Sequence, residues 1–223
     1  MTVASLDRVV RSREALLSAL DDAPGVDLSF LPAFPAEGGR EADYLRFLHA
    51  LVLTLQPRHV LEFGSGASTA VLAHAAVSSG DCAVSSVEHD PRAFAQTSAR
   101  LENGVPVTLQ LAPLVARVRA GRLGPSYLAD SSLFASSQPA DLVLVGGPPE
   151  ILGGRATMLP VALEYAQCGS IVLFDDGGRD AVTSWEQLLA AAVEVHRPDG
   201  FTHGLAALIL VAPRTAQIRL APK

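Results

Sequence analysis

Residues 61–69 read LEFGSGAST, and the first three of them complete the apolar segment HVLEF at 59–63. Glycine loses more conformational freedom on folding than any other residue, so Gly64 and Gly66 imply a sharp turn or a close approach to the backbone. The hydroxyl residues that follow them suit the start of a helix. We therefore predict a buried strand, a tight loop that something approaches closely, and then a helix.

Short apolar segments alternate with helical ones on both sides of this loop. We predict strands at 59–63, 83–88, 107–111, 141–146, 170–174 and 205–211 and helices at 67–78, 91–101, 156–167 and 180–194, with two earlier helices at 4–20 and 40–55. Strands buried on both faces and separated by helices indicate a parallel α/β sheet. Ligands of such sheets bind at the carboxyl ends of the strands, which is where the glycine loop lies.

Composition narrows the class of protein. A chain of 223 residues that is 49% hydrophobic fits one large globular domain, and its net charge of −6 without a run of like charges disfavours nucleic acid and anionic lipid as partners. Cys82 and Cys168 lie far apart with no metal-ligand spacing, so we expect buried thiols. No apolar run is long enough for a membrane span, and the charged N-terminal residues do not suit a signal peptide. We expect a cytoplasmic protein.

The loop has part of a nucleotide-binding pattern. Gly64 and Gly66 give the spacing G-x-G, but Thr69 stands where a dinucleotide fingerprint has its third glycine, which disfavours an oxidoreductase that binds NAD. Glu88 ends the second predicted strand. Its separation from the glycines along the sequence is about that of the acidic residue that binds ribose hydroxyls in dinucleotide-binding folds. The alternative is that Glu88 only starts the turn EHDP and caps the next helix. Glu62 lies two residues before the first glycine.

An ordered set of motifs extends this pattern. The chain resembles the class I S-adenosylmethionine-dependent methyltransferases, and most closely a small-molecule branch of them, in ExGxG, EHDP (88–91), LAPL (111–114), DLVLVGGPP (141–149), GRATMLP (154–160) and GSIVLFDDGGR (169–179). The resemblance implies a doubly wound, mostly parallel seven-stranded sheet, of the Rossmann-like methyltransferase type, with helices in front. We expect residues 57–223 to form the cofactor-binding α/β part and residues 1–56 a helical cap or lid.

The same resemblance implies roles for the residues of the loop. Glu62 would hold the aminoacyl end of S-adenosylmethionine or brace the loop, and Glu88 would bind its ribose. The remaining positions would let the backbone pass close to the cofactor or offer hydroxyls and helix amides to its carboxylate; they are Gly64, Ser65, Gly66, Ser68 and Thr69. S-adenosylmethionine has no pyrophosphate, so the third glycine is not needed.

One motif departs from the family. The small-molecule branch usually has DGPP after the fourth strand, whereas this chain has Gly146, Gly147 and two prolines. Without that aspartate a divalent cation has fewer oxygen ligands, so we expect no metal site. Asp175 and Asp176 would then act as a general base or orient the substrate, and the alternative is that DDGGR is only a turn. Tyr127, Arg155 and His203 are weaker candidates for the active site.

We therefore expect metal-independent methyl transfer to a small-molecule nucleophile, without nucleic acid or membrane as partner, by a chain that forms a homodimer. The alternative within the same pocket is attack on the aminopropyl carbon of S-adenosylmethionine, by aminopropyl transfer or cyclisation. A non-catalytic scaffold is less favoured, because a pocket without ligand gains nothing from an unpaired carboxylate at Glu88. The motif before the two prolines also disfavours the nucleic-acid amine methyltransferases.

The segment between the first two helices raises a separate expectation. Residues 21–39 are rich in proline and glycine yet carry Phe30, Leu31 and Phe34. Apolar residues on a loop are a liability unless they cover something. We predict that residues of about 24–48 help to form a substrate chamber above Gly146 and Asp175, and the alternatives are a dimer interface or packing on the sheet.

Overall fold

The computed structural model describes residues 3–31, 42–101, 104–119, 122–128, 139–152, 154–175, 193–196 and 205–211. Its helices are α1 (Val3–Asp22), α2 (Ala42–Leu55), α3 (Ala67–Ser79), α4 (Pro91–Arg100) and α5 (Leu159–Tyr165), with short 3-10 helices η1 (Ala23–Gly25), η2 (Glu150–Leu152) and η3 (Arg155–Met158). Its strands are β1 (His59–Phe63), β2 (Ala83–Glu88), β3 (Val107–Leu111), β4 (Leu114–Arg119), β5 (Arg122–Tyr127), β6 (Ala140–Val145), β7 (Ala166–Asp175), β8 (Val193–His196) and β9 (Leu205–Val211).

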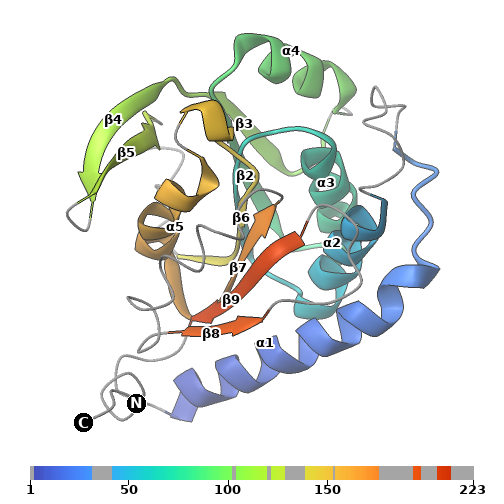
Figure 1. The fold of residues 1–223 in the computed structure, drawn as a ribbon. Coiled ribbons are helices and arrows are strands. Elements are labelled where there is room, and N and C mark those ends of the chain that lie inside the picture. Colours follow the sequence, from blue (N-terminus) through green and yellow to red (C-terminus); the bar gives the residue numbers. More distant parts are fainter. Residues whose placement is uncertain are drawn as a thin grey trace, which may run out of the picture.

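Seven of the described strands form one sheet, in the order β3-β2-β1-β6-β7-β9-β8. The first five in this order are parallel, whereas β9 runs antiparallel to both β7 and β8. Figure 1 shows helices on both faces of the sheet. The predicted fold class, a doubly wound and mostly parallel seven-stranded sheet with N-terminal helices, is confirmed.

Alternate residues of the strands bury opposite faces of the sheet, as the period of two in a strand requires. On β6, Leu142 and Leu144 belong to a core with α1, α2 and α3, whereas Val143 and Val145 belong to a second core with α5 and Tyr127. All four side chains are at most 1% exposed. The strand therefore reads as a continuous apolar run because both of its faces are covered.

Several predicted boundaries are wrong. Ala166 and Gln167 belong to β7 instead of the preceding helix, and Val193 and Glu194 belong to β8 instead of a helix over 180–194. The rest of that predicted helix lies outside the described residues. The antiparallel hairpin of β4 and β5 was not predicted at all. It stands off from the main sheet (Figure 1), paired from Leu114 with Tyr127 to Arg119 with Arg122.

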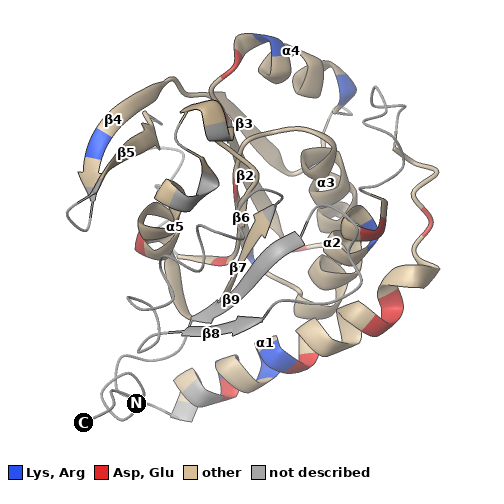
Figure 2. Cartoon of the chain, viewed as in Figure 1, with Lys and Arg blue, Asp and Glu red and all other residues tan. Residues whose placement is uncertain are grey.

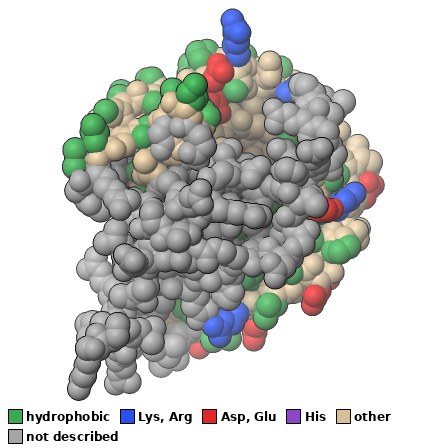
Figure 3. Space-filling model, viewed as in Figure 1, with side chains coloured by type: hydrophobic (Ala, Val, Ile, Leu, Met, Phe, Trp, Pro, Cys, Tyr) green, Lys and Arg blue, Asp and Glu red, His purple; other side chains and the backbone are tan. Residues whose placement is uncertain are grey.

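The hairpin exposes apolar side chains. Val118 and Leu123 are cross-strand partners, and they are 68% and 71% exposed. Figure 3 shows hydrophobic side chains along this edge of the molecule.

None of the helices that the structure describes is both long and apolar enough to cross a membrane.

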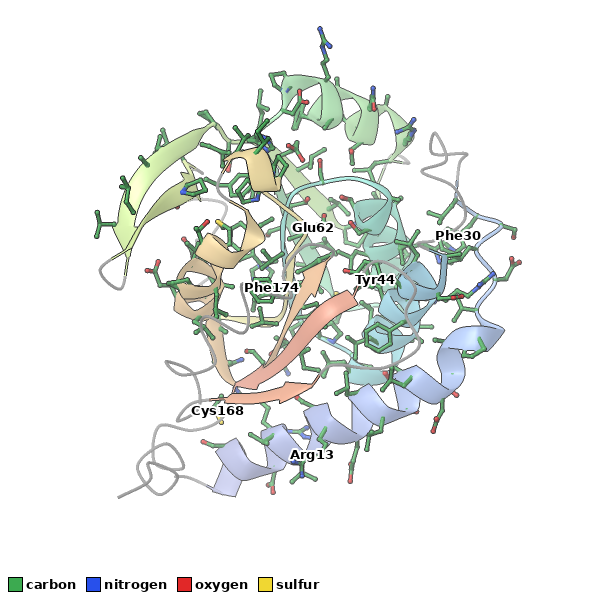
Figure 4. All side chains as sticks on the ribbon, viewed as in Figure 1. Arg13, Phe30, Tyr44, Glu62, Cys168 and Phe174 are labelled. Carbon is green, nitrogen blue, oxygen red and sulfur yellow. The ribbon has the colours of Figure 1, made fainter. Side chains whose placement is uncertain are left out.

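The described end of the first inter-helix segment packs on the core. Phe30 and Leu31 contact the cluster formed by α1, α2 and α3. The ring of Phe30 stacks on His74 of α3, with ring centres 3.6 Å apart and planes within 8°. Figure 4 shows Phe30 beside α2 and α3. Phe34 lies outside the described residues, so a substrate chamber over 24–48 stays a prediction.

Candidate functional site

The loops after β1 and β6 meet at the point where the sheet changes direction. From β1 the chain continues to β2 on one side, whereas β6 pairs with β1 on the other side. In open α/β sheets this switch point leaves a crevice at the carboxyl ends of the strands, and ligands bind there. Gly64, Ser65 and Gly66 follow β1, and Gly146 and Gly147 follow β6, so the predicted loops lie at the expected place.

Gly64 is a glycine for two local reasons. Its φ is +91°, which side chains rarely adopt, and a Cβ there would lie 2.7 Å from the backbone nitrogen of Gly147. The amides of Gly146 and Gly147 both donate to the carbonyl of Phe63 at 2.8 Å. The group that approaches Gly64 closely is therefore the loop after β6. These contacts connect the loop after β1 to the loop after β6.

Gly66 is different, because the space beside it is open. Its backbone is extended, with φ at 173°, and a Cβ built on it would have no neighbour within 4 Å. Helix α3 begins at the next residue, and the amides of a helix's first turn have no carbonyl partner within the helix. An open face beside free amides suits a ligand with a carboxylate. Gly66 is thus the position of the loop where a cofactor has room to approach.

Glu62 fixes this loop from below. Its side chain is fully buried, and its two oxygens accept hydrogen bonds of 2.6 Å from the hydroxyls of Ser68, Thr69 and Ser86. Thr69 Oγ1 in turn accepts the amide of Gly66 at 2.9 Å. Burial raises the pKa of Glu62 to about 7, although the three hydroxyls oppose this shift. Figure 4 shows Glu62 in the middle of the molecule. Of the two roles that the sequence left open, this geometry favours bracing the loop.

Glu88 also holds the loop. Its Oε2 accepts the amide of Ser65 at 2.8 Å, and its Oε1 accepts the amides of His89 and Asp90 at 2.7 and 2.8 Å. Glu88 is only 4% exposed. Ser65 Oγ also donates to Oε2, at a longer 3.4 Å. The predicted contact of Glu88 with ribose stays a prediction.

Helix α4 has its own cap. Asp90 Oδ1 accepts the amide of Arg92 at 2.8 Å at the start of that helix. The capping that could have been an alternative explanation for Glu88 therefore belongs to Asp90.

An aromatic pair that the motifs did not single out lies over the loop after β6. The ring of Tyr127 packs edge-on against His89, with centres 6.0 Å apart, and a Cβ on Gly147 would lie 2.4 Å from the Tyr127 hydroxyl. Nδ1 of His89 lies 2.9 Å from Oε1 of Glu88. Position 147 is thus a glycine because Tyr127 of the hairpin occupies the place of its side chain. Tyr127 is one of the weaker candidates from the sequence, and the histidine in EHDP is the signal that could have added His89.

The predicted catalytic residues are only partly described. Asp175 ends β7, whose carboxyl end faces the same edge of the sheet as Gly146. Its side chain lies outside the described part, as do Asp176, His203 and the side chain of Arg155. Among the residues that the structure describes, no group of three or more histidine, cysteine or acidic side chains is arranged to hold a metal ion. Burial raises the pKa of Cys82 to about 11, so this thiol stays protonated at neutral pH.

Solved structures share this architecture. One is the O-methyltransferase TomG from Streptomyces achromogenes, involved in tomaymycin synthesis and in complex with S-adenosylmethionine, at 22% identity, a TM-score of 0.54 and 90% coverage of each chain. Another is an O-methyltransferase from Bacillus cereus in complex with S-adenosylhomocysteine, at 16% identity, a TM-score of 0.55 and coverage of 90% of this chain and 91% of the other. At these identities the likeness shows the fold.

A third is the S-adenosylhomocysteine-bound methyltransferase PaMTH1 from Podospora anserina, at 14% identity, a TM-score of 0.55 and coverage of 96% of this chain and 97% of the other. A search of curated protein sequences finds no match. The sequence profile of a family described as Methyltransferase domain matches residues 61–177, which is more than half of the chain. The chain therefore belongs to this methyltransferase family, and with its sheet order and glycine loop it is a class I enzyme that depends on S-adenosylmethionine.

Proposed function

We propose that this enzyme methylates an oxygen nucleophile of a small molecule without a metal ion. The observation that carries the proposal is the loop at Gly66, which has open space beside it and is braced by Glu62 through Thr69. Two of the solved structures with the same fold are O-methyltransferases, which supports oxygen as the acceptor. No feature of the described residues favours attack on the aminopropyl carbon.

The loop residues have separate tasks in this proposal. S-adenosylmethionine supplies an electrophilic methyl group on its sulfonium. Gly64 and Gly66 let the backbone approach it, Ser68 and Thr69 at the start of α3 direct amides toward its carboxylate, and Glu88 accepts from its ribose. Ser65 keeps Glu88 in place through its amide. The chain's main contribution is alignment, because methyl transfer needs an in-line approach of the nucleophile.

Asp175 or Asp176 would take the proton of the substrate hydroxyl. Asp175 ends β7 at the carboxyl edge of the sheet, beside the strand β6 that leads to Gly146, and Asp176 is the next residue in the sequence. A carboxylate placed there suits a general base, and glycine at 146 removes a ligand that the related enzymes use for a cation. These assignments support a reaction that proceeds without magnesium.

The other parts of the proposal concern the surroundings of the site. Residues 1–56 would cap the cofactor-binding part at 57–223, the substrate would be a small molecule instead of nucleic acid, and the enzyme would act in the cytoplasm. We also propose a homodimer through the β4–β5 hairpin, since Val118 and Leu123 leave an apolar surface there.

Filling the open space at Gly66 tests the central proposal. Gly66→Ala adds a methyl group in the space assigned to the cofactor, and its backbone is extended, so the fold tolerates the change. We expect S-adenosylmethionine affinity, measured by calorimetry, to fall at least tenfold with an unchanged melting temperature. Gly25→Ala is the matched control, because a Cβ there also meets nothing within 4 Å but lies in η1. Equal affinities in the two variants would refute the assignment.

A second experiment identifies the reaction. The wild-type enzyme is incubated with S-adenosylmethionine that carries a deuterated methyl group and with a panel of hydroxylated small molecules. Mass spectrometry of the products should show the deuterated methyl on oxygen. A product that carries an aminopropyl group instead would contradict methyl transfer.

A further inference from the structure

A cavity lies at the opposite end of the sheet from the glycine loop. It has a volume of about 320 Å³ and opens where β1, β6 and β7 begin, between α1 and the turn after α2. Along β6, Asp141 lines this cavity and Gly146 lies at the carboxyl end. Five residues of strand separate them by about 17 Å. The cavity is therefore distinct from the site of methyl transfer.

Positive charge dominates the cavity. Arg8 and Arg11 of α1 and Arg58 before β1 line it, and Asp141 is the one acidic residue among its described lining. Arg8 and Arg11 are three positions apart and so lie on the same side of the helix. Figure 2 shows basic and acidic positions along α1. Three arginines around one hollow are notable in a chain whose net charge is −6.

The acidic residue does not neutralise these arginines. Asp141 Oδ2 accepts the backbone amide of Arg58 at 2.9 Å, and Oδ1 accepts the side-chain amide of Gln167 at 3.1 Å. The Arg11 side chain donates only to the carbonyl of Asp7. Within the described residues, none of the three guanidinium groups forms an ion pair with a carboxylate. Their donors remain available to a ligand.

The wall of the cavity is fixed by the fold. Ser12 is 3% exposed, and its hydroxyl donates to the carbonyl of Gly169 at 2.6 Å, which ties α1 to the start of β7. A Cβ on Gly169 would lie 2.6 Å from the side chain of Arg8, so glycine there leaves room for this arginine. Arg8 is thus held in place against the backbone of β7.

Gln56 supplies an independent observation. It follows α2, its φ is +49°, and its backbone amide donates to the carbonyl of Val52 at 3.0 Å. Glycine is the usual residue at this position of a helix end, because a side chain there is strained. Here the residue is Gln56, which lines the cavity, and its side-chain amide can bind a ligand. Strained backbone of this kind clusters at ligand sites.

We propose that this cavity binds a small phosphate-bearing molecule. Arginine binds phosphate through paired donors, and three guanidinium groups from two segments can reach different oxygens of tetrahedral phosphate groups. A volume of about 320 Å³ lies at the lower end of the range for small-molecule sites, roughly 300–1,000 Å³, and exceeds what a single ion needs. The ligand is therefore an organic phosphate or a diphosphate.

Inorganic pyrophosphate is a suitable probe, with calorimetry at constant ionic strength as the measurement. We expect saturable binding to the wild-type chain and at least a tenfold loss in Arg11→Gln/Arg58→Gln. Both side chains are exposed, so the double variant should keep the wild-type melting temperature. Arg117→Gln is the control, because Arg117 is an exposed arginine on β4 that does not line the cavity.

Each outcome decides the proposal. Loss of binding in the double variant but not in Arg117→Gln supports the site. Absence of saturable binding to the wild type, equal binding in all variants, or an equal loss in the double variant and the control would overturn it. Citrate, which also carries several negative charges, should bind more weakly than pyrophosphate, and equal or tighter binding of citrate would overturn phosphate as the ligand class. S-adenosylmethionine affinity should remain unchanged throughout.

Discussion

Glu62 and Ser86 are direct partners on the neighbouring parallel strands β1 and β2, and the hydroxyl of Ser86 donates to Oε2 of Glu62 at 2.6 Å. The carboxyl group is thus held within the sheet, and through Thr69 it braces the loop at Gly66. Glu62 therefore shapes the loop without needing a contact with the cofactor itself.

The first prediction is that Glu62 makes stability depend on pH. Its pKa is raised from 4.5 to about 7 in the folded chain, so the folded state keeps a proton that the unfolded state releases. The contribution is fully present below pH 4.5 and falls as pH rises through 7, by about 3 kcal/mol in total. Glu62→Gln should abolish this loss, as urea unfolding at pH 5 and pH 8 would show.

The hydroxyl network can accept this change. Glutamine can accept from Thr69 and Ser86 through its oxygen and donate to Ser68 through its nitrogen. Glu14→Gln, at an exposed position of α1, is the control and should keep the wild-type pH dependence. If Glu62→Gln also kept it, the buried carboxyl would not be its source.

The second prediction concerns Glu88. Glu88→Ala should weaken S-adenosylmethionine binding by about 2 kcal/mol, roughly 30-fold, since it removes a charged acceptor and frees the amide of Ser65. Calorimetry measures the affinity. Asp90→Ala is the matched control: it removes the cap of α4, which should cost about 1 kcal/mol of stability while affinity stays the same. A folded Glu88→Ala variant with wild-type affinity would exclude the ribose contact.

The third prediction is that chelation leaves turnover intact. Gly146 stands where the small-molecule branch that the sequence resembles usually has an aspartate, so we expect exhaustive EDTA treatment to change the initial rate of methyl transfer by less than twofold. Loss of turnover that magnesium restores would show that Asp175 and Asp176 bind a cation together with a further ligand.

The fourth prediction concerns the contact between α2 and α3. His49 Nε2 and His74 Nδ1 lie 3.0 Å apart. The pKa of His49 is lowered from 6.5, mainly by burial and to a smaller extent by the charge of the neighbouring His74. Protonation therefore favours the unfolded chain, so the stabilising contribution is present above pH 6.5 and is lost as pH falls below it. His49→Gln should lose less stability between pH 7.5 and pH 5.5 than the wild type in urea unfolding. An identical loss would assign the effect to other groups.

The fifth prediction tests the proposed homodimer. Leu123→Asp places a charge on the exposed face of the hairpin, and like charges at a two-fold contact repel. Light scattering after size-exclusion chromatography should show a dimer for the wild type and a monomer for the variant. A monomeric wild type would exclude the dimer, and a dimeric variant would exclude this face.

The sequence predicts the sheet well because the inner strands are mostly apolar and almost entirely buried. HVLEF and DLVLV are read correctly for this reason, and the motifs at Gly64 and Glu88 lie at neighbouring strand ends as expected. The β4–β5 hairpin escapes because β5 contains Gly124 and Pro125, which are unfavourable in strands. Only the structure explains that glycine: a Cβ there would lie 2.8 Å from Thr157.

A single sequence does not reveal which residues contact each other across the fold. Nothing in the sequence indicates that the freedom of Gly64 serves the loop after β6, or that Tyr127 occupies the side-chain place of Gly147. The sequence also left two roles open for Glu62. The choice between these two roles depends on three hydroxyls that come from α3 and β2, and only the folded chain brings these hydroxyls together.

Helix α1 has a consequence for how this enzyme can be divided. Leu16 and Ala19 are at most 4% exposed, and they share one core with Val60 of β1 and Leu144 of β6. Cutting the chain before β1 would therefore expose the apolar face of the central strands to water. The residues in front of the sheet consequently unfold together with it in one cooperative step, and they cannot be exchanged between relatives as an independent module.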